Sequence, residues 1–282
     1  MRLSTENLIL ASDAMIDLQL HTHHSDGDWT PEDLLGYLIE NEFGLAAITD
    51  HDRVDMVAPF QKLAIEKKFP LLVAVEMSSE WKGNLTDFLC FGFDPDNHAL
   101  HALAEDVAQR QYGNTRKIFK ELQKKGYPIT DDDLQTALSK PSTQQVTELL
   151  SWSKYHDGDT PWGRELMDAG FTYMTQPPAA IVEAAHQSKG ICILAHPGRD
   201  DGFTCYDSDL LDELREEAPI DGIEAYYPKH SEEQIQQYLD YAEKHDLLVS
   251  SGSDSHGSKN PPIKYPATYS QKLLERLEIK FV

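Results

Sequence analysis

The sequence has few cysteines and no long apolar run. Its three cysteines form no Cys-x-x-Cys pair, and Cys90 and Cys192 lie in apolar segments, where a cysteine usually acts as a small buried hydrophobic residue. We therefore expect no disulfide. No segment approaches the roughly 20 apolar residues that span a membrane, and no secretion signal is recognisable at the amino terminus. These absences predict a soluble, cytoplasmic protein with no membrane partner.

Positive charge is also scarce. The 282 residues include 25 Lys and Arg against 48 Asp and Glu, for a formal net charge of −23. A surface of this average sign repels polyanions, which argues against a long nucleic acid as a partner. A phosphorylated substrate needs local positive charge, and bound divalent cations are the most direct source. We expect a small phosphorylated molecule or a short oligonucleotide as the partner, and the sequence carries no signal for the oligomeric state.

Two blocks of the sequence alternate short apolar runs with amphipathic segments. The first block contains AMIDLQL, LAAITD, PLLVAVE and TDFLCFGFD, and the second contains ICILAH, GIEAYY and LLVSSGSD. This alternation of strand and helix predicts a parallel sheet or barrel. The length and the 40% hydrophobic content are sufficient for one large α/β domain with a sizeable core.

A helical segment separates the two blocks. Three stretches between residues 104 and 154 have helical periodicity, with no strand-like run between them, and KYHDGDTPWGRE is predicted to be a loop from its Gly, Pro and Asp content. We interpret residues 105–174 as a helical insertion domain within an α/β barrel formed by residues 1–104 and 175–282. The first dozen residues lack a clear period and are predicted to be a frayed arm or an extra edge element.

Potential metal ligands follow at least five of the predicted strands. Asp26, His51, Glu76, His196 and the pair Asp254 and His256 each come after an apolar run. In a closed parallel barrel the carboxyl ends of all strands open onto one face, where such enzymes build their active sites. Packing alone would place apolar or turn-forming residues there, so the pattern predicts a metal site.

The ligand types indicate the chemistry of this site. Imidazoles and carboxylates without thiolate favour Mn²⁺, Fe²⁺ or Zn²⁺ over a structural zinc cage and do not choose among them. A bridging carboxylate such as Glu76 would hold two ions close together. Two or three adjacent cations would acidify a bound water to hydroxide, orient a phosphate and neutralise the charge on the leaving group. The site therefore predicts a metal-dependent hydrolase of phosphoesters.

The motifs DLQLHTHHSDGDWTPEDLL, LAAITDHD, VAVEMS, LAHPGR and GSDSHG resemble the successive motifs of the PHP (polymerase and histidinol phosphatase) family. They cover the first and the last hundred residues. The helical insertion resembles, more weakly, the nucleoside 3′,5′-bisphosphate phosphatase and 5′-to-3′ exoribonuclease branch of that family. The resemblance implies a distorted (β/α)7 barrel with the helical insertion lying over the metal-bearing rim as a substrate cap. It also implies seven metal ligands, which are His21, Asp26, His51, Glu76, His196, Asp254 and His256.

Two positions depart from the family pattern. Gln19 stands where the first histidine is expected, and its amide oxygen could still reach a metal; His23 is the alternative ligand, at the cost of a shorter loop after it. Leu89 stands at a second expected histidine position, and Asp87, on the same face of its strand, could substitute as a carboxylate ligand. The loss of two imidazoles could leave two ions instead of three, or a catalytically weak site.

Two further residues are candidates for binding the phosphate. Arg199, in HPGRDD, could clamp a phosphate with two parallel hydrogen bonds, or could be an ordinary surface arginine. His230 follows the run GIEAYY and could contact the phosphate or act as a general acid, with Lys229 as a weaker candidate.

Three alternative functions stay open. A PHP-like protein that binds metal or phosphate with weak or lost catalysis would explain Gln19 and Leu89. A phosphatase similar to histidinol phosphatase fits the same ligands. An amidohydrolase that cleaves carbon–nitrogen bonds also carries histidines and aspartates at strand ends, but the sequence has no candidate for a carboxylated lysine there.

Overall fold

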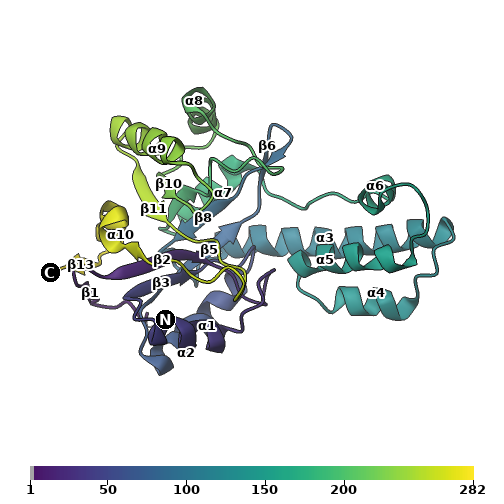
Figure 1. The fold of residues 1–282 in the computed structure, drawn as a ribbon, viewed down its shortest axis with the longest axis horizontal. Coiled ribbons are helices and arrows are strands. Elements are labelled where there is room, and N and C mark those ends of the chain that lie inside the picture. Colours follow the sequence, from purple (N-terminus) through teal and green to yellow (C-terminus); the bar gives the residue numbers. More distant parts are fainter. Residues whose placement is uncertain (1–2) are drawn as a thin grey trace. The chain divides into compact units, whose positions relative to one another are not determined.

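The computed structural model describes residues 3–282, which divide into two compact units (Figure 1). The first unit contains the residues up to Leu103 together with Gln176–Val282, and the second contains Ala104–Thr175. Helix α3 (His98–Lys124) carries the chain from the first unit into the second. In the described part of the chain, no helix combines the length and the apolarity that a membrane span requires.

The strands of the first unit form two main sheets. One sheet has the order β11 (Leu248–Ser251), β10 (Gly222–Tyr226), β9 (Ile191–Leu194), β8 (Phe88–Phe91) and β5 (Ala74–Met77). The other has the order β12 (Tyr265–Pro266), β2 (Met15–Leu20), β3 (Leu45–Ile48) and β4 (Leu71–Leu72). Single bridges link the two sheets at Leu20 with Ser255 and at His51 with Glu76. The predicted α/β fold is confirmed.

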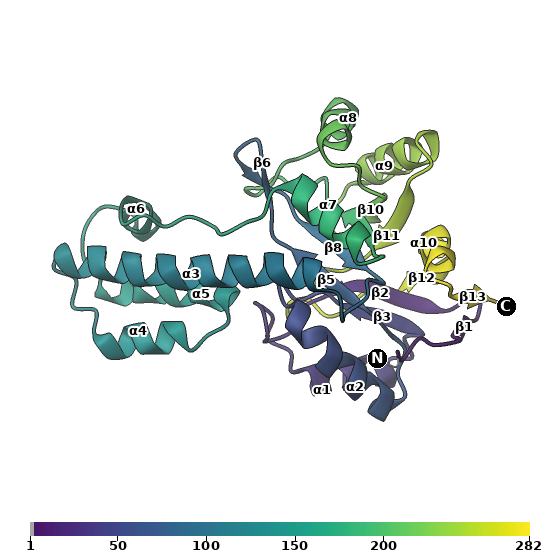
Figure 2. The ribbon, with the colours of Figure 1, turned by 180° about the vertical axis from the view of Figure 1, so that it is seen from behind.

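Helices pack on the outer faces of these sheets. Helices α1 (Pro31–Glu40) and α2 (Val57–Lys67) lie side by side against β2 and β3 (Figure 2). Helix α1 begins where the Thr30 hydroxyl accepts a hydrogen bond from the Asp33 amide, with Pro31 in its first turn. Its apolar face, Leu34 and Leu38, is fully buried. The other sheet is contacted by α7 (Pro178–Gln187), α9 (Glu232–Lys244) and α10 (Gln271–Arg276), while α8 (Ser208–Glu217) connects β9 to β10.

Strand β8 runs antiparallel to both of its neighbours, β5 and β9, so the prediction of an all-parallel sheet is wrong at this strand. The chain returns from β5 through a hairpin of β6 (Glu80–Trp81) and β7 (Asn84–Leu85), whereas a parallel return needs a crossover of about a dozen residues or more. Because β8 is reversed, Asp87 at its beginning lies at the edge where β5 ends. Leu89 pairs directly with Glu76.

Two strands contain irregularities close to the same edge. The register shifts between Asp17 and Leu20 in β2, and between Glu224 and Tyr226 in β10. A bulge changes the direction in which nearby side chains point and is common beside active sites. Gln19 lies within the first irregularity, and both Gln19 and Glu224 are fully buried.

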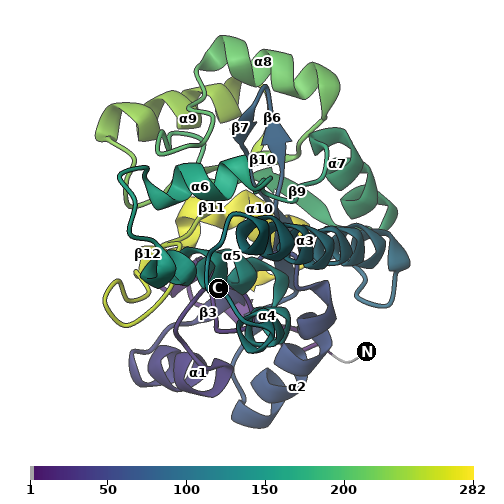
Figure 3. The same ribbon diagram turned by 90° about the vertical axis from the view of Figure 1, so that its right-hand side faces the viewer.

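The second unit is helical and has its own hydrophobic core. It contains most of α3 together with α4 (Asp131–Leu138), α5 (Ser142–Ser151) and α6 (Trp162–Asp168), and Figure 3 views α3 along its axis with α4 and α5 beside it. The core includes Ile118, Leu149 and Trp152. The segment KYHDGDTPWGRE is only partly a loop, because its last four residues begin α6, where the Trp162 indole donates to the Leu149 carbonyl at 3.0 Å.

Two alternatives were predicted for the amino-terminal segment, a frayed arm or an extra edge element, and the structure shows the edge element. Strand β1 (Ile9–Leu10) pairs in parallel with β13 (Lys280–Phe281) near the end of the chain. Residues 1 and 2 of this segment lie outside the described residues.

Candidate metal centre

The seven predicted ligands meet in one cluster at the carboxyl ends of strands from both sheets, with His21 at its centre. The His21 Nε2 atom lies 3.0 Å from Oε2 of Glu76 and 3.2 Å from Oδ1 of Asp254. Its Nδ1 atom lies 3.6 Å from Oδ1 of Asp26. The first strand, the third strand and the last strand of the predicted pattern therefore contribute side chains to one place.

The other three histidines surround these carboxylates. Nε2 of His196 lies 3.2 Å from Oε1 of Glu76, and Nε2 of His256 lies 3.2 Å from Oδ2 of Asp26. Nε2 of His51 lies 3.8 Å from Oε2 of Glu76 and the same distance from Oδ2 of Asp26. The side chains of Asp26 and His256 are 35% and 36% exposed, so the cluster is open to solvent on that side.

Three overlapping groups of side chains could each hold an ion, because their potential ligand atoms lie within 4.8 Å of one another. These groups are His21, Asp26, His51 and His256; His21, Glu76 and Asp254; and His51, Glu76 and Asp87. Glu76 belongs to two of them, as a bridging carboxylate would. Nitrogen and oxygen donors of this kind suit divalent transition metals.

The buried atoms of the cluster fit a bound cation. Glu76 is fully buried, yet in residues 3–282 the groups that face its carboxylate are imidazoles and the amide of Gln19, and no lysine or arginine forms an ion pair with it. Oε1 of Gln19 is buried without a hydrogen-bond partner in the described structure. An unpaired buried polar atom costs about 1–3 kcal/mol, and an ion could accept its lone pair.

Protonation balances the charges of the cluster. Burial by itself would raise the pKa of Glu76, but the imidazoles of His51, His196 and His21 hold it well below its usual range. Burial would likewise lower the pKa of His51, but the carboxylates of Glu76 and Asp26 raise it to about 9. The carboxylates thus stabilise protons on the imidazoles, and a divalent cation would displace those protons on binding.

Gln19 and Asp87 both lie within the cluster. The Gln19 amide donates hydrogen bonds to both oxygens of Glu76, at 3.1 and 3.2 Å. Asp87 is 4% exposed and accepts a hydrogen bond from the Ser79 amide at 3.4 Å. Burial and the nearby Glu76 carboxylate raise the pKa of Asp87 to about 7, because both disfavour its charged form. Their assignment as ligands stays a prediction.

Leu89 and His23, which were compared with Asp87 and Gln19 from the sequence, are not part of the cluster. Leu89 is fully buried in the hydrophobic core. His23 is exposed, and its Nδ1 atom is 3.1 Å from the Trp29 carbonyl oxygen. His23 belongs to none of the potential metal groups in residues 3–282.

Arg199 lies at the edge of the cluster. Its Nη1 atom is 3.8 Å from Oδ2 of Asp254, and its guanidinium lies over the Phe203 ring at 4.0 Å from the ring centre. The guanidinium also donates to Asp201. The Tyr227 hydroxyl donates to the same oxygen of Asp254 at 3.3 Å, which leaves Oδ1 of Asp254 facing His21.

Both ring nitrogens of His230 contact backbone groups, and its predicted role towards phosphate stays a prediction. Its Nε2 atom accepts a hydrogen bond from the Gly198 amide at 3.0 Å, and its Nδ1 atom lies 2.9 Å from the Ala225 carbonyl oxygen, to which it donates. Both ring nitrogens are therefore engaged by the backbone, and the residue is 8% exposed. In this position His230 supports the loop at Gly198.

The environment of His230 predicts a pH-dependent contribution to stability. Burial lowers the pKa of His230 from 6.5 to about 4. As the pH falls, the unfolded chain therefore takes up a proton at this histidine before the folded chain does. The contribution of neutral His230 to the free energy of unfolding is fully present above pH 6.5 and is lost as the pH falls towards 4. The loss at pH 5 is on the order of 2 kcal/mol. Urea unfolding with EDTA at pH 7 and pH 5 should show this loss in the wild type and a smaller loss in His230→Gln. Equal losses in both proteins would contradict the prediction.

Buried carboxylates behind the cluster hold its loops. Asp50 accepts hydrogen bonds from the Thr22 amide and the Ser25 hydroxyl, both at 2.6 Å. Asp17 accepts from the Ser253 amide at 2.9 Å, and Glu224 accepts from the His196 amide at 2.9 Å. Their only signal in the sequence is an acidic residue within or directly after an apolar run.

Two of the candidate ligands have an uncommon backbone conformation. His196 and Asp254 have φ angles of 28° and 55°, in the left-handed region that residues other than glycine rarely adopt. Such conformations persist only where the surrounding structure enforces them, and they cluster at functional sites.

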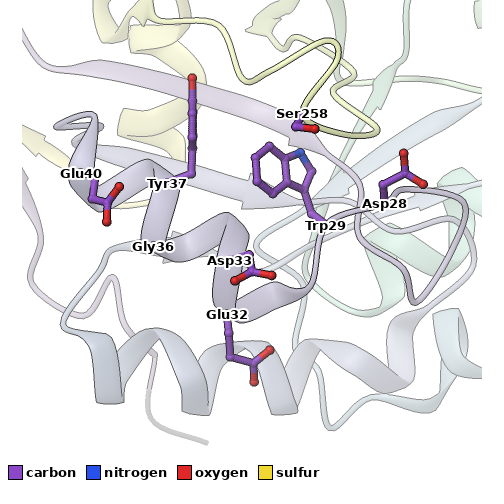
Figure 4. Close-up of a pocket in the computed structure, with 8 residues that line it drawn as sticks. All are labelled: Asp28, Trp29, Glu32, Asp33, Gly36, Tyr37, Glu40 and Ser258. Carbon is purple, nitrogen blue, oxygen red and sulfur yellow. The ribbon is translucent and has the colours of Figure 1, made fainter.

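A separate pocket of about 450 Å³ lies beside α1 (Figure 4). It is lined by Asp28, Trp29, Glu32, Asp33, Gly36, Tyr37, Glu40 and Ser258. Four of these residues are acidic, so the pocket would repel a phosphate. We therefore do not place a phosphorylated substrate there.

Comparison with known proteins identifies homologues that act on phosphoesters. The 3′,5′-nucleoside bisphosphate phosphatase of Chromobacterium violaceum is 28% identical over 251 residues, which cover 86% of this chain and 87% of the relative. A 5′-3′ exoribonuclease of Haemophilus influenzae is 24% identical, with 85% and 89% of the two chains covered. No family model matches the chain.

Solved structures share the fold. A protein of Bifidobacterium adolescentis assigned as a metal-dependent phosphoesterase superposes with a TM-score of 0.72 at 23% identity, covering 93% of this chain and 96% of the other. A two-domain protein of Bacteroides vulgatus that contains a predicted PHP-like metal-dependent phosphoesterase has a TM-score of 0.51 at 11% identity, with 99% of this chain and 67% of the other covered. The sequence relatives confirm the resemblance to nucleoside bisphosphate phosphatases and exoribonucleases, and the solved structures show that the fold is shared with a PHP-like protein.

Proposed function

We propose that this chain, a homologue of nucleoside bisphosphate phosphatases and exoribonucleases, is a metal-dependent phosphoric ester hydrolase. Its substrate is a small molecule with a phosphomonoester or a terminal phosphodiester, such as a nucleoside 3′,5′-bisphosphate or a short oligonucleotide. The observation that carries this proposal is the set of overlapping groups around Glu76 and His21 at one edge of the sheets.

The proposed architecture is a distorted (β/α)7 barrel. The two sheets would close through the bridges of Leu20 with Ser255 and of His51 with Glu76. The barrel strands are then β2, β3, β5, β8, β9, β10 and β11, with β8 reversed. We propose that the helical domain of residues 105–174 acts as a substrate cap.

The residues proposed to hold two or three divalent ions are His21, Asp26, His51, Glu76, His196, Asp254 and His256, with Gln19 and Asp87 as further ligands. Mn²⁺, Fe²⁺ and Zn²⁺ all suit these donors. Bound there, the ions supply a nucleophile from water at neutral pH and neutralise charge on the phosphate and the leaving group.

Other side chains of this chain position the reacting groups. Tyr227 orients Asp254 by donating to its Oδ2 atom, which leaves Oδ1 directed towards His21. Arg199, stacked on Phe203, presents its guanidinium beside Asp254, where it can donate to phosphate oxygens. His230 holds the amide of Gly198 and so fixes the loop that carries Arg199.

A panel of phosphoesters tests the proposal and separates it from a histidinol phosphatase. The Mn²⁺-loaded protein should release phosphate from adenosine 3′,5′-bisphosphate more rapidly than from histidinol phosphate. A preference for histidinol phosphate would overturn the substrate class. Normal metal binding without phosphate release from any member would overturn the hydrolase itself and favour the alternative of a binding protein.

Gln19 stands where the family pattern expects a histidine, and this difference is one reason to consider a binding protein without catalysis. Variants of Gln19 test it. We expect Gln19→His to add an imidazole ligand and to raise the affinity for Mn²⁺ by about tenfold, because imidazole is a stronger ligand than an amide oxygen. Gln19→Leu is the matched variant without a donor and should bind Mn²⁺ more weakly than the wild type. Calorimetric titration with Mn²⁺ measures both, and equal affinities in all three proteins would remove Gln19 from the ligand set.

A further inference from the structure

A carboxylate beside the candidate metal centre lies between two cations. The Arg199 Nε atom donates to Oδ1 of Asp201. The Lys229 Nζ atom lies 3.6 Å from Oδ2 of the same residue. Each oxygen of Asp201 therefore faces one cationic side chain.

This group is next to the proposed reaction site. Arg199 reaches Oδ2 of Asp254 with its Nη1 atom, at 3.8 Å, while its Nε atom contacts Asp201. One guanidinium thus extends from a candidate metal ligand to the Asp201 carboxylate. A second anionic group on the substrate would lie close to the phosphate that reacts. The Arg199 guanidinium is placed to contact both groups.

The loop that carries these residues is fixed in position. The Gly198 amide donates to His230, and the Gly198 carbonyl accepts from Nε2 of Gln234 at 3.1 Å. A Cβ atom at Gly198 would come within 2.7 Å of both His230 and Gln234, so a side chain there would require these two residues to shift. With Phe203 beneath its guanidinium, Arg199 is held in place before any ligand arrives.

Asp201, in contrast, is free to leave. Its side chain is 51% exposed, and ion pairs between exposed groups contribute little to stability. A phosphate group carries up to twice the charge of a carboxylate and offers three acceptor oxygens. It can therefore replace Asp201 between the same two cations, and Asp201 can turn into solvent.

We propose that Arg199 and Lys229 bind a second anionic group of the substrate, a phosphate that is not hydrolysed, and that Asp201 occupies its place until the substrate arrives. The proposal rests on the proposed function, since it names which phosphoesters that site prefers. It assigns Lys229 and Asp201 to the selection of substrates with two phosphates over substrates with one.

The test compares adenosine 3′,5′-bisphosphate with adenosine 3′-monophosphate as substrates of the Mn²⁺-loaded protein. Lys229→Gln should lower kcat/KM for the bisphosphate about tenfold, mainly through KM, and change that for the monophosphate less than about twofold. Asp201→Asn should raise kcat/KM for the bisphosphate several-fold, because it removes a competing negative charge. An equal effect on both substrates, or no effect on either, would overturn the proposal.

The chain provides a matched control pair. Lys272 and Asp246 form an exposed contact of 3.5 Å, similar to that of Lys229 and Asp201, on α10 and before β11. Lys272→Gln and Asp246→Asn should leave both substrates unaffected. A change as large as that of the Lys229 and Asp201 variants would show a general effect of surface charge and would also overturn the proposal.

Calorimetric binding of adenosine 5′-monophosphate separates this proposal from the proposed function. The wild type should bind it more tightly than adenosine, and Lys229→Gln should reduce that difference about tenfold. If both binding results hold but no phosphate is released from any substrate, the second phosphate site is supported and the hydrolase is rejected. If hydrolysis is normal but Lys229→Gln binds adenosine 5′-monophosphate as tightly as the wild type, the hydrolase is supported and the second phosphate site is rejected. The second site would also be rejected if the wild type bound adenosine 5′-monophosphate no more tightly than adenosine.

Discussion

Replacing Glu76 with glutamine is expected to lower phosphate release about a thousandfold, equivalent to roughly 4 kcal/mol of transition-state stabilisation. Glu76 is fully buried and contacts His21 and His196 within 3.2 Å, and it belongs to two of the three potential metal groups. The neutral amide keeps the size of the side chain but removes the charge that would bridge two ions. Phosphate release and metal content, measured on the same sample, should fall together.

A matched control for this variant is Glu80→Gln. Glu80 is exposed on the hairpin that follows β5, so its replacement should change neither activity nor metal content. Circular dichroism should show a folded protein in both cases. Activity of Glu76→Gln within tenfold of the wild type, at unchanged metal content, would contradict the proposed role of Glu76.

Metal binding is expected to raise the thermal stability of the protein strongly. An ion that binds only the folded chain stabilises it by about 4 kcal/mol at a free concentration a thousand times its Kd. For a domain of this size, that corresponds to a rise in Tm of roughly 10 °C. Differential scanning fluorimetry with Mn²⁺ and with EDTA measures the shift.

The same scan on Glu76→Gln tests whether the shift arises at the cluster. The variant should lose most of the shift, because one ligand is missing from two of the groups. The EDTA-treated variant and the EDTA-treated wild type should melt within a few degrees of each other. An equal Mn²⁺ shift in both proteins would indicate that the ion binds elsewhere.

The main part of the candidate site could be predicted because it depends on a repeated pattern. His51, Glu76 and His196 each follow a buried run of the sequence, and strand ends on one side of a sheet meet at one edge. Asp87 could be placed near them because the family pattern expects a ligand at Leu89, and strand alternation puts Asp87 on the same face. The structure brings all four together, although their use as metal ligands stays a prediction.

The direction of β8 was not predicted, although its signal was present. Only ten residues separate Met77 from Phe88, too few for the usual helical crossover, and they contain the turn that joins β6 to β7. The helix α6 was missed for a related reason. Gly158 and Pro161 in the same segment indicate a loop, while the burial of Leu166 that stabilises the helix depends on tertiary contacts.

The orientation of His230 could not have been inferred from its neighbours in the sequence. Its hydrogen bonds go to Gly198 and Ala225, and the first of these is distant in the sequence. The irregularity at Glu224 and Tyr226 lies just before it and changes the course of the chain. Single residues that depend on such local shifts are beyond what periodicity can predict.

The most direct test of a metal-dependent hydrolase is phosphate release from adenosine 3′,5′-bisphosphate by one protein sample in three states, with metal content measured in each. We expect release by the Mn²⁺-loaded protein, none after EDTA treatment, and recovery when Mn²⁺ is restored at two or more ions per chain. Release that is unchanged by EDTA would contradict it. So would a fully loaded protein that releases no phosphate from this or any other phosphoester of the panel.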